Sequence, residues 1–145
     1  MNGFMMLLNL ISVVGTGTQN KPYIEKRFEV TSYCSCRICC GKYASIPLSK
    51  RRIADGTKFA SVKSSYFVAG PPQMPFGTVL SIPGYAKGRK VVCKDRGGDI
   101  KGNRLDLYMP THKEARQWGR KWVMVKIYKK INRHKMEKVG NEWER

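Results

Sequence analysis

Apolar and polar side chains alternate in several short stretches of this chain, which is the pattern of β-strands that bury one face. In residues 28–33, Phe28 and Val30 alternate with Glu29 and Thr31. Residues 122–131 repeat the same alternation near the other end of the chain. A side-chain period of two indicates a half-buried strand, so we predict a strand in each segment.

Four further segments are short, apolar and rich in β-branched side chains. They are residues 66–70, 77–85, 89–95 and 104–110. Glycine and proline separate them at close intervals, which is typical of strands joined by tight turns. By contrast, residues 41–61 are polar and basic, and we expect a long loop there.

A single segment, residues 111–121, has helical features. Thr111 stands three residues before Glu114, which is the spacing of a capping box. Gly119 ends the segment, so the sequence predicts a helix of about two turns. We expect Trp118 in this helix and Trp122 just beyond it to pack in the core, as large aromatic side chains usually do.

Many short strands with one short helix favour a mainly β fold. A small closed barrel is the preferred architecture because closure leaves no strand edge exposed, although periodicity alone also suits a sandwich. We assign residues 23–131 to this domain. Residues 1–22 are an apolar N-terminal segment and joint, and residues 132–145 are a charged C-terminal tail.

The N-terminal segment has two interpretations. Residues 3–15 are mostly apolar and uncharged, too few to span a bilayer as a helix but long enough for a signal-peptide core. Gly15 and Gly17 offer small residues for cleavage, but no lysine or arginine precedes the apolar run. The segment is therefore either an export signal or an apolar strand or helix that stays on the protein.

The chain is strongly basic, with 28 Lys and Arg against 10 Asp and Glu and a net charge of +18. This excess predicts anionic partners rather than a fold: nucleic acid, an anionic membrane or an anionic wall polymer. No zinc-finger spacing, RNA-binding signature or basic zipper is present, so we expect no specific nucleic-acid recognition. A solvated basic surface without a specific partner is the alternative.

Two aspartates frame a glycine-rich turn in the middle of the chain. Asp95 ends one predicted strand, Asp106 lies in the next, and three glycines fall between them. The eleven-residue separation allows a reversing loop that brings both carboxyl groups into one cleft. Paired carboxyl groups are the usual tools for cleaving glycosidic bonds. Turn capping, or ion pairs with the nearby Arg96, Lys101 or Arg104, is the alternative.

The run DRGGDIKGNRLD, residues 95–106, resembles the signature of the three-aspartate (3D) domain. Segments around it also resemble this family, in the expected order: residues 30–44, 54–61, 67–85 and 110–128. The resemblance covers roughly residues 28–128 and implies a small six-stranded double-psi β-barrel with one short helix.

The resemblance also implies an activity. Membrane-bound lytic transglycosylase A and small peptidoglycan-cleaving proteins of spores and phages cut the MurNAc–GlcNAc β-1,4 bond without water, leaving 1,6-anhydroMurNAc ends. By this resemblance Asp106 is the general acid and base, and Asp95 supports it. We expect a secreted or envelope protein, of bacterial or phage-lysis type, acting as a monomer on peptidoglycan strands and anionic envelope polymers. A non-catalytic module that binds glycan or another polyanion is the alternative.

Four other residues are candidates for substrate binding, with surface packing as the alternative: Asp99, Lys101, Asn103 and Arg104. The chain departs from the family pattern at Gly70, where many members have the first of the three aspartates. Asp99 and Asp55 are additional acids near the site.

The cysteines allow three states. Cys34, Cys36, Cys39 and Cys40 fall within seven positions, and Cys93 lies two residues before Asp95. We expect structural disulfides, with free thiols and a metal site as the alternatives. Because zinc sites usually draw ligands from two separated knuckles and the histidines lie far off in sequence, we assign no metal ligand and expect no cofactor.

Overall fold

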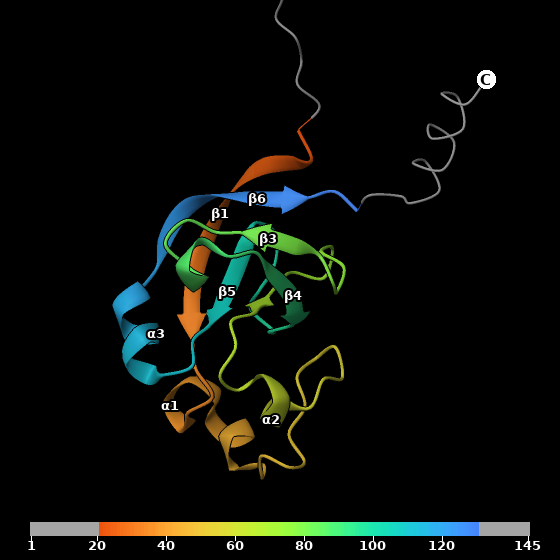
Figure 1. Ribbon diagram of the computed structural model, residues 1–145. Helices are drawn as coiled ribbons and strands as arrows, with labels where there is room; N and C mark the ends of the chain where they lie inside the picture. The colour runs from red at the N-terminus through yellow and green to blue at the C-terminus, as the bar shows by residue number, and fades with distance from the viewer. Residues whose placement is uncertain (1–20, 131–145) are drawn as a thin grey trace, which may run out of the picture.

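Residues 21–130 are described by the computed structural model, and six strands in this range close into a β-barrel (Figure 1). The strands are β1 (Tyr23–Tyr33), β2 (Val68–Ala69), β3 (Val79–Ser81), β4 (Val91–Asp95), β5 (Arg104–Tyr108) and β6 (Lys121–Tyr128). The helices are α1 (Arg37–Cys40), α2 (Phe59–Val62) and α3 (His112–Trp118), with 3₁₀ turns η1 (Gly41–Ser45) and η2 (Ala86–Gly88). The predicted leader and tail lie outside the described residues, except for residues 21 and 22.

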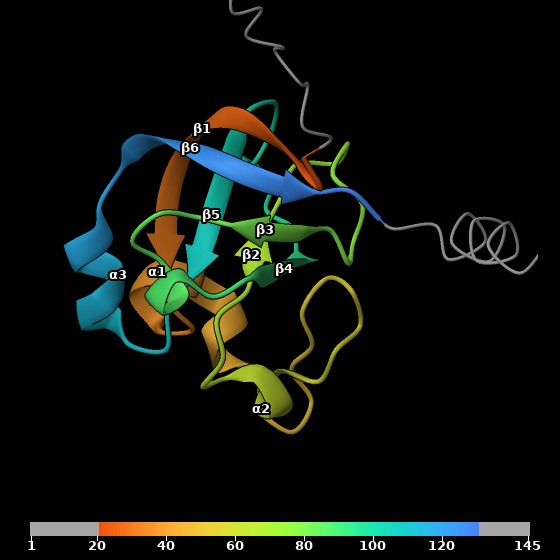
Figure 2. The ribbon, with the colours of Figure 1, turned by 45° about the horizontal axis from the view of Figure 1, so that its top comes forward.

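The strand order around the barrel is β1-β5-β2-β4-β3-β6, which returns to β1. The β1–β5 and β2–β4 pairs are parallel, and the remaining pairs are antiparallel. The long strand β1 crosses the barrel beside β6, as Figure 2 shows. The prediction of a mainly β, closed six-stranded barrel is confirmed, and the sandwich alternative is wrong.

The barrel interior holds the main core. Val30, Leu80, Leu105, Leu107 and Val125 are completely buried there. Val30 lies in β1 and Val125 in β6, on the apolar faces that the alternation predicted.

A second, smaller apolar cluster lies at one end of the barrel. It contains Ile53, Phe59, Phe67 and Tyr108. Phe67 stacks on the ring of Tyr108, with ring centroids 4.4 Å apart, and Phe59 of α2 meets the same ring edge to face. The cluster fixes α2 and the preceding loop to the barrel end toward which β1 and β5 run (Figures 1 and 2).

Helix α3 begins as predicted. The backbone N–H of Glu114 donates to the Thr111 hydroxyl, and the Thr111 N–H donates to the Glu114 carboxylate, so the capping box is complete. The one-turn helices α1 and α2 were not predicted, because four residues are too few to produce a periodic pattern. None of the helices within residues 21–130 has the length and apolar character needed to cross a membrane.

The two tryptophans behave differently. Trp118 packs against the barrel core, as predicted, and its indole N–H donates to the carbonyl of Val30 at 3.4 Å. The same prediction is wrong for Trp122, which is 54% exposed. Trp122 and the buried Val125 have opposite parity in β6, so the indole points outward, where the Arg27 guanidinium lies 5.0 Å from the ring centre.

Tyr85 provides a test of how the barrel end is held. Its buried hydroxyl contacts the carbonyl oxygens of Tyr108 at 2.6 Å and Phe67 at 2.9 Å. In Tyr85→Phe, both buried carbonyls lose this partner, and we expect the free energy of unfolding to fall by about 1–3 kcal/mol. Urea denaturation measures the loss. The exposed Tyr43→Phe is the matched control, and an equal effect in both variants would contradict the assignment.

Candidate functional site

A cleft of about 670 Å³ lies at the barrel end where the second apolar cluster is found. Its volume falls within the usual range for small-molecule sites. The carboxyl-bearing residues in its lining are Asp95, Asp99 and Asp106. Asp95 and Asp106 are the two aspartates that frame the glycine-rich turn in the sequence.

Strand β2 brings Asp95 and Asp106 together. Ala69 is the partner of Asp95 in β4 on one side and of Asp106 in β5 on the other. Two strand spacings, about 9–10 Å, therefore separate the two aspartate backbones, and both side chains reach the same cleft. The sequence prediction of a shared cleft is met by this register.

Asp106 combines partial burial with one hydrogen-bond donor. The hydroxyl of Thr31 donates to Asp106 Oδ1 at 2.9 Å. Burial raises the pKa of Asp106 to about 6; the Thr31 hydrogen bond opposes the shift, and the negative charge of Asp95 adds to it. A carboxyl group with this pKa exchanges its proton near neutral pH, as a general acid and base must.

Asp95 is held by three donors. The phenol of Tyr33 donates to Oδ2 at 2.6 Å, and the backbone N–H groups of Ala54 and Arg96 donate to Oδ1 at 3.0 and 2.9 Å. Burial and the charge of Asp95 raise the pKa of Tyr33 well above 10, so this phenol keeps its proton. Asp95 is thus a positioned acceptor.

The turn-capping alternative is partly correct for Asp95, because it accepts the N–H of the next residue. The ion-pair alternative is not supported. Within residues 21–130, the salt bridges are those of Lys94 with Asp55 and of Arg104 and Arg120 with Glu29.

Sequence reasoning missed Thr31 and Tyr33. Both lie on the same face of β1 as Glu29, and the parallel register sets these three residues opposite Arg104, Asp106 and Tyr108. The alternation did place Thr31 and Tyr33 away from the core. However, nothing in the chain predicted that β5 would be the neighbour of β1.

The predicted substrate-binding residues divide into two groups. Asp99 lines the cleft, whereas Lys101, Asn103 and Arg104 are not in its lining. Arg104 binds Glu29 instead, with a distance of 2.9 Å from Nη2 to Oε2. The other additional acid, Asp55, is also absent from the lining and pairs with Lys94.

Gly70 is buried beside the site, and a side chain there has no room. A Cβ atom at this position would lie 2.8 Å from Cys93 Sγ and 3.0 Å from Met74 Sδ. Because real Cβ contacts are essentially never shorter than 3.0 Å, the sulfur of Cys93 occupies space that a larger residue at position 70 requires. A larger side chain at position 70 therefore requires Cys93 or Met74 to move.

One wall of the cleft is built by the segment that carries the clustered cysteines. Cys39, Cys40, Tyr43 and Ile46 line this wall. The side chain of Arg51 braces the segment by donating to the carbonyls of Ser35, Ala44 and Ile46.

All five cysteines are free thiols, so the expectation of structural disulfides is not met. Three of them instead converge on one imidazole. The sulfurs of Cys34, Cys36 and Cys39 and a ring nitrogen of His112 all lie within 4.8 Å of one another. Among the described residues, these four are placed to hold a metal ion, contrary to the prediction of no metal ligand, which rested on the distance of His112 along the chain.

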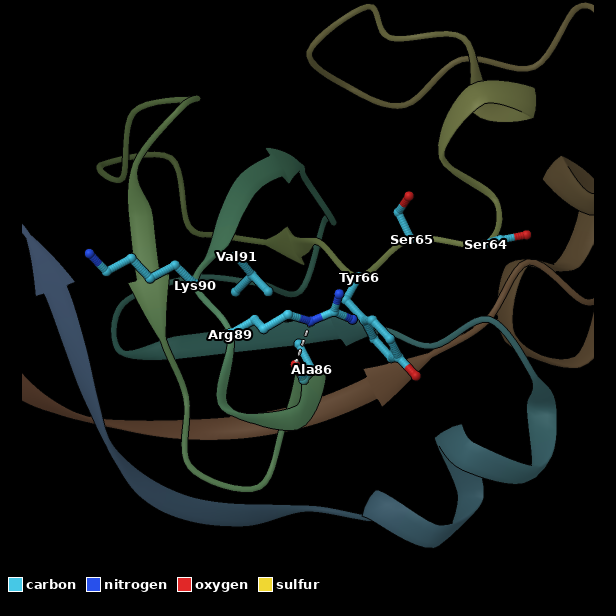
Figure 3. A pocket seen from close by; sticks show the side chains of 7 residues that line it. All are labelled: Ser64, Ser65, Tyr66, Ala86, Arg89, Lys90 and Val91. Atoms are coloured by element: carbon cyan, nitrogen blue, oxygen red, sulfur yellow. Dashed lines mark hydrogen bonds between the residues drawn. The ribbon is translucent and has the colours of Figure 1, made fainter.

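A second, smaller hollow of about 290 Å³ lies elsewhere on the barrel (Figure 3). Its lining is Ser64, Ser65, Tyr66, Ala86, Arg89, Lys90 and Val91. Arg89 donates from Nε to the Ala86 carbonyl at 3.2 Å. This lining has no carboxyl group, whereas Asp95 and Asp106 of the sequence motif both line the larger cleft.

Comparison with known proteins matches residues 67–129 to the family model of the 3D domain. This range contains β2 to β6, Asp95 and Asp106, and it excludes β1 and the clustered cysteines. It is narrower than the range of residues 28–128 over which the sequence resembles the family.

Two proteins of Bacillus subtilis (strain 168) are similar to parts of the chain. The cell wall-binding protein YocH is 37% identical over 57 residues, which cover 39% of this chain and 19% of YocH. YabE, named for a proposed role in cell wall shaping, is 29% identical over 99 residues, which cover 67% of this chain and 21% of YabE. The chain thus matches about a fifth of the length of each relative.

The raised pKa of Asp106 predicts a pH-dependent stability. Asp106 titrates near pH 3.9 when unfolded and near 6 when folded, so its contribution to stability is greatest below about pH 4 and is lost as the pH rises through about 6. Asp106→Asn cannot ionise. As the pH rises from about 4 to 7, the free energy of unfolding of the variant should therefore increase relative to that of the parent. Urea denaturation at several pH values tests this, and a constant difference would contradict it.

Packing at Gly70 predicts coupling to Cys93. Gly70→Ala should lower the free energy of unfolding by about 1–3 kcal/mol through overpacking. In a Cys93→Ala background the same change should cost about 1 kcal/mol less, because the opposing sulfur is gone. A double-mutant cycle by chemical denaturation measures this coupling. Equal losses in both backgrounds would show that Cys93 does not restrict position 70.

Proposed function

The chain is a 3D-domain protein, and from this premise we propose that it is a peptidoglycan lytic transglycosylase. It cleaves the MurNAc–GlcNAc β-1,4 bond and leaves 1,6-anhydroMurNAc ends. The observation that carries the proposal is a carboxyl group with a pKa of about 6, that of Asp106, in a cleft large enough for sugar rings.

In the proposed reaction, Asp106 acts twice. Its carboxylic acid first gives a proton to the glycosidic oxygen as the bond from that oxygen to muramoyl C1 breaks. The resulting carboxylate then takes the proton of the muramoyl 6-hydroxyl as O6 bonds to C1. Asp106 gives up one proton and takes one back, so it ends the reaction protonated as it began. No water enters the product. A pKa near the working pH suits both steps.

Asp95 and Tyr33 support this residue. The negative charge of Asp95 favours the protonated form of Asp106 and also stabilises positive charge that develops at the sugar. Tyr33 and two backbone N–H groups fix the position of Asp95, so this charge is held in place before substrate binds. Thr31 orients the Asp106 carboxyl from the neighbouring strand.

The remaining features agree with an envelope substrate. YocH is named a cell wall-binding protein, and the name of YabE refers to cell wall shaping. A net charge of +18 attracts the chain to anionic wall polymers at long range. We therefore propose the cell envelope or the extracellular side as its place of action, and peptidoglycan strands as its partner.

A non-catalytic glycan-binding module is the second candidate function. Two observations favour it: YocH is named for binding, and Gly70 stands where many family members have an aspartate. In this case the same cleft holds a glycan strand and Asp106 serves as a hydrogen-bonding group.

Product analysis separates the two functions. Incubation of the full chain with purified peptidoglycan should release fragments that mass spectrometry identifies by their 1,6-anhydro ends. Asp106→Asn should lower the rate by about 10²–10⁴-fold, because it removes the proton donor, while co-sedimentation with the walls persists. Glu25→Gln, an exposed site on β1 outside the cleft lining, is the matched control and should keep the parental rate.

Other outcomes have defined meanings. Reducing-end products in place of anhydro ends would make the protein a hydrolase. Binding to walls by the parent chain without any released product would establish the binding module. Equal rates for Asp106→Asn and Glu25→Gln would remove Asp106 from the mechanism.

A further inference from the structure

We propose that this protein binds one zinc ion at the barrel end, beside the carboxylate cleft. The ligands are three thiolate sulfurs and one imidazole nitrogen, from Cys34, Cys36, Cys39 and His112. The site is structural and does not depend on the proposed activity.

The distances suit a tetrahedral metal. His112 Nδ1 lies 3.5 Å from the sulfur of Cys34, 3.3 Å from that of Cys36 and 3.7 Å from that of Cys39. The sulfurs of Cys34 and Cys39 are 3.6 Å apart. Zinc bonds of about 2.3 Å to sulfur and 2.0–2.1 Å to nitrogen place tetrahedral ligand atoms about 3.5–3.8 Å from one another.

Hydrogen bonding alone does not explain this convergence. A neutral imidazole nitrogen offers either one lone pair or one proton, and a thiol is a weak donor and a weak acceptor. Three sulfurs around a single Nδ1 exceed that capacity. A cation at the centre satisfies all four ligand atoms at once.

The fold explains why residues so far apart meet. β1 and β5 are parallel, with Tyr33 opposite Tyr108, so the chain leaves both strands at the same end of the barrel. Cys34 follows β1 directly, and His112 is the first residue of α3, shortly after β5. Cys36 and Cys39 are three residues apart at the start and within the turn of α1, which places them on one side of it.

Cys40 is not one of the proposed zinc ligands, because its thiol is directed at a backbone carbonyl. Its thiol donates to the carbonyl of Cys34 at 3.1 Å and is not part of the four-ligand group. Cys93 is buried in the barrel core and contacts Arg96. Both cysteines therefore provide internal controls.

The donor set and its surroundings select zinc. Three soft thiolates with one imidazole in a four-coordinate arrangement are typical of structural zinc sites. Three thiolates and Zn²⁺ carry a net charge of −1. This charge is favourable beside Arg116 and Arg120, which line the adjoining surface hollow with His112 and Cys39.

Helix α1 of the cysteine segment has little packing of its own. Helix α1 has four residues, no side-chain cap and no buried residue, and Ile38 within it is 81% exposed. A single helical turn is unstable without tertiary packing. A metal bound by Cys36 and Cys39 supplies the missing attachment and joins the segment to β1 and α3. Because Cys39 and Cys40 line the cleft, the ion also shapes the cleft wall.

Metal analysis of the full chain tests the proposal. Chain purified under reducing conditions, without chelator, should contain about one zinc per molecule by elemental mass spectrometry. Cys36→Ser and His112→Ala should lose most of this zinc. Cys40→Ser, next to a ligand in the same segment, and Cys93→Ser should retain it.

Two measurements on the parent chain test zinc binding without relying on variants that could fail to fold. Removal of the metal by a chelator should lower the melting temperature, and added zinc should restore it. Cobalt(II) added to the metal-free chain should give the visible absorption of a tetrahedral thiolate site. Absence of both responses, zinc loss in Cys40→Ser equal to that in Cys36→Ser, or a Cys34–Cys39 disulfide in the purified chain would overturn the proposal.

Discussion

The parallel pairing of β1 with β5 is the constraint on which the site depends. Its register sets Thr31 beside Asp106, and it carries Tyr33 to the rim where Asp95 ends β4. A shift of one residue would turn the hydroxyl of Thr31 into the core and expose Val30. The same apolar alternation that closes the barrel therefore also positions the polar groups of the cleft.

Two opposing electrostatic effects meet at Asp106. A net charge of +18 favours ionised carboxyl groups throughout the molecule. Local burial and the neighbouring charge of Asp95 nevertheless prevail, and the pKa of Asp106 rises to about 6. The two aspartates have different surroundings: Asp95 receives three hydrogen bonds, whereas Asp106 receives one from Thr31 and burial raises its pKa.

Local patterns revealed much of this fold from the sequence. Alternation located the strands, and the Thr111–Glu114 spacing located α3. Features that depend on which strands become neighbours were not accessible in this way. The contacts of Thr31 with Asp106, and of the cysteines with His112, join residues more than 70 positions apart. Their partners become visible only when the barrel order is known.

The pairing of β1 with β6 also determines where the chain enters and leaves the barrel. Tyr23 pairs with Tyr128, and the N–H of Lys129 donates to the carbonyl of Pro22, so the chain enters and leaves the barrel at neighbouring points. The eleven residues of β1 separate this pole from Tyr33 in the cleft by up to roughly 30 Å. Residues 21 and 130, the two limits of the described chain, therefore both lie at the end of the barrel remote from Tyr33 and the cleft.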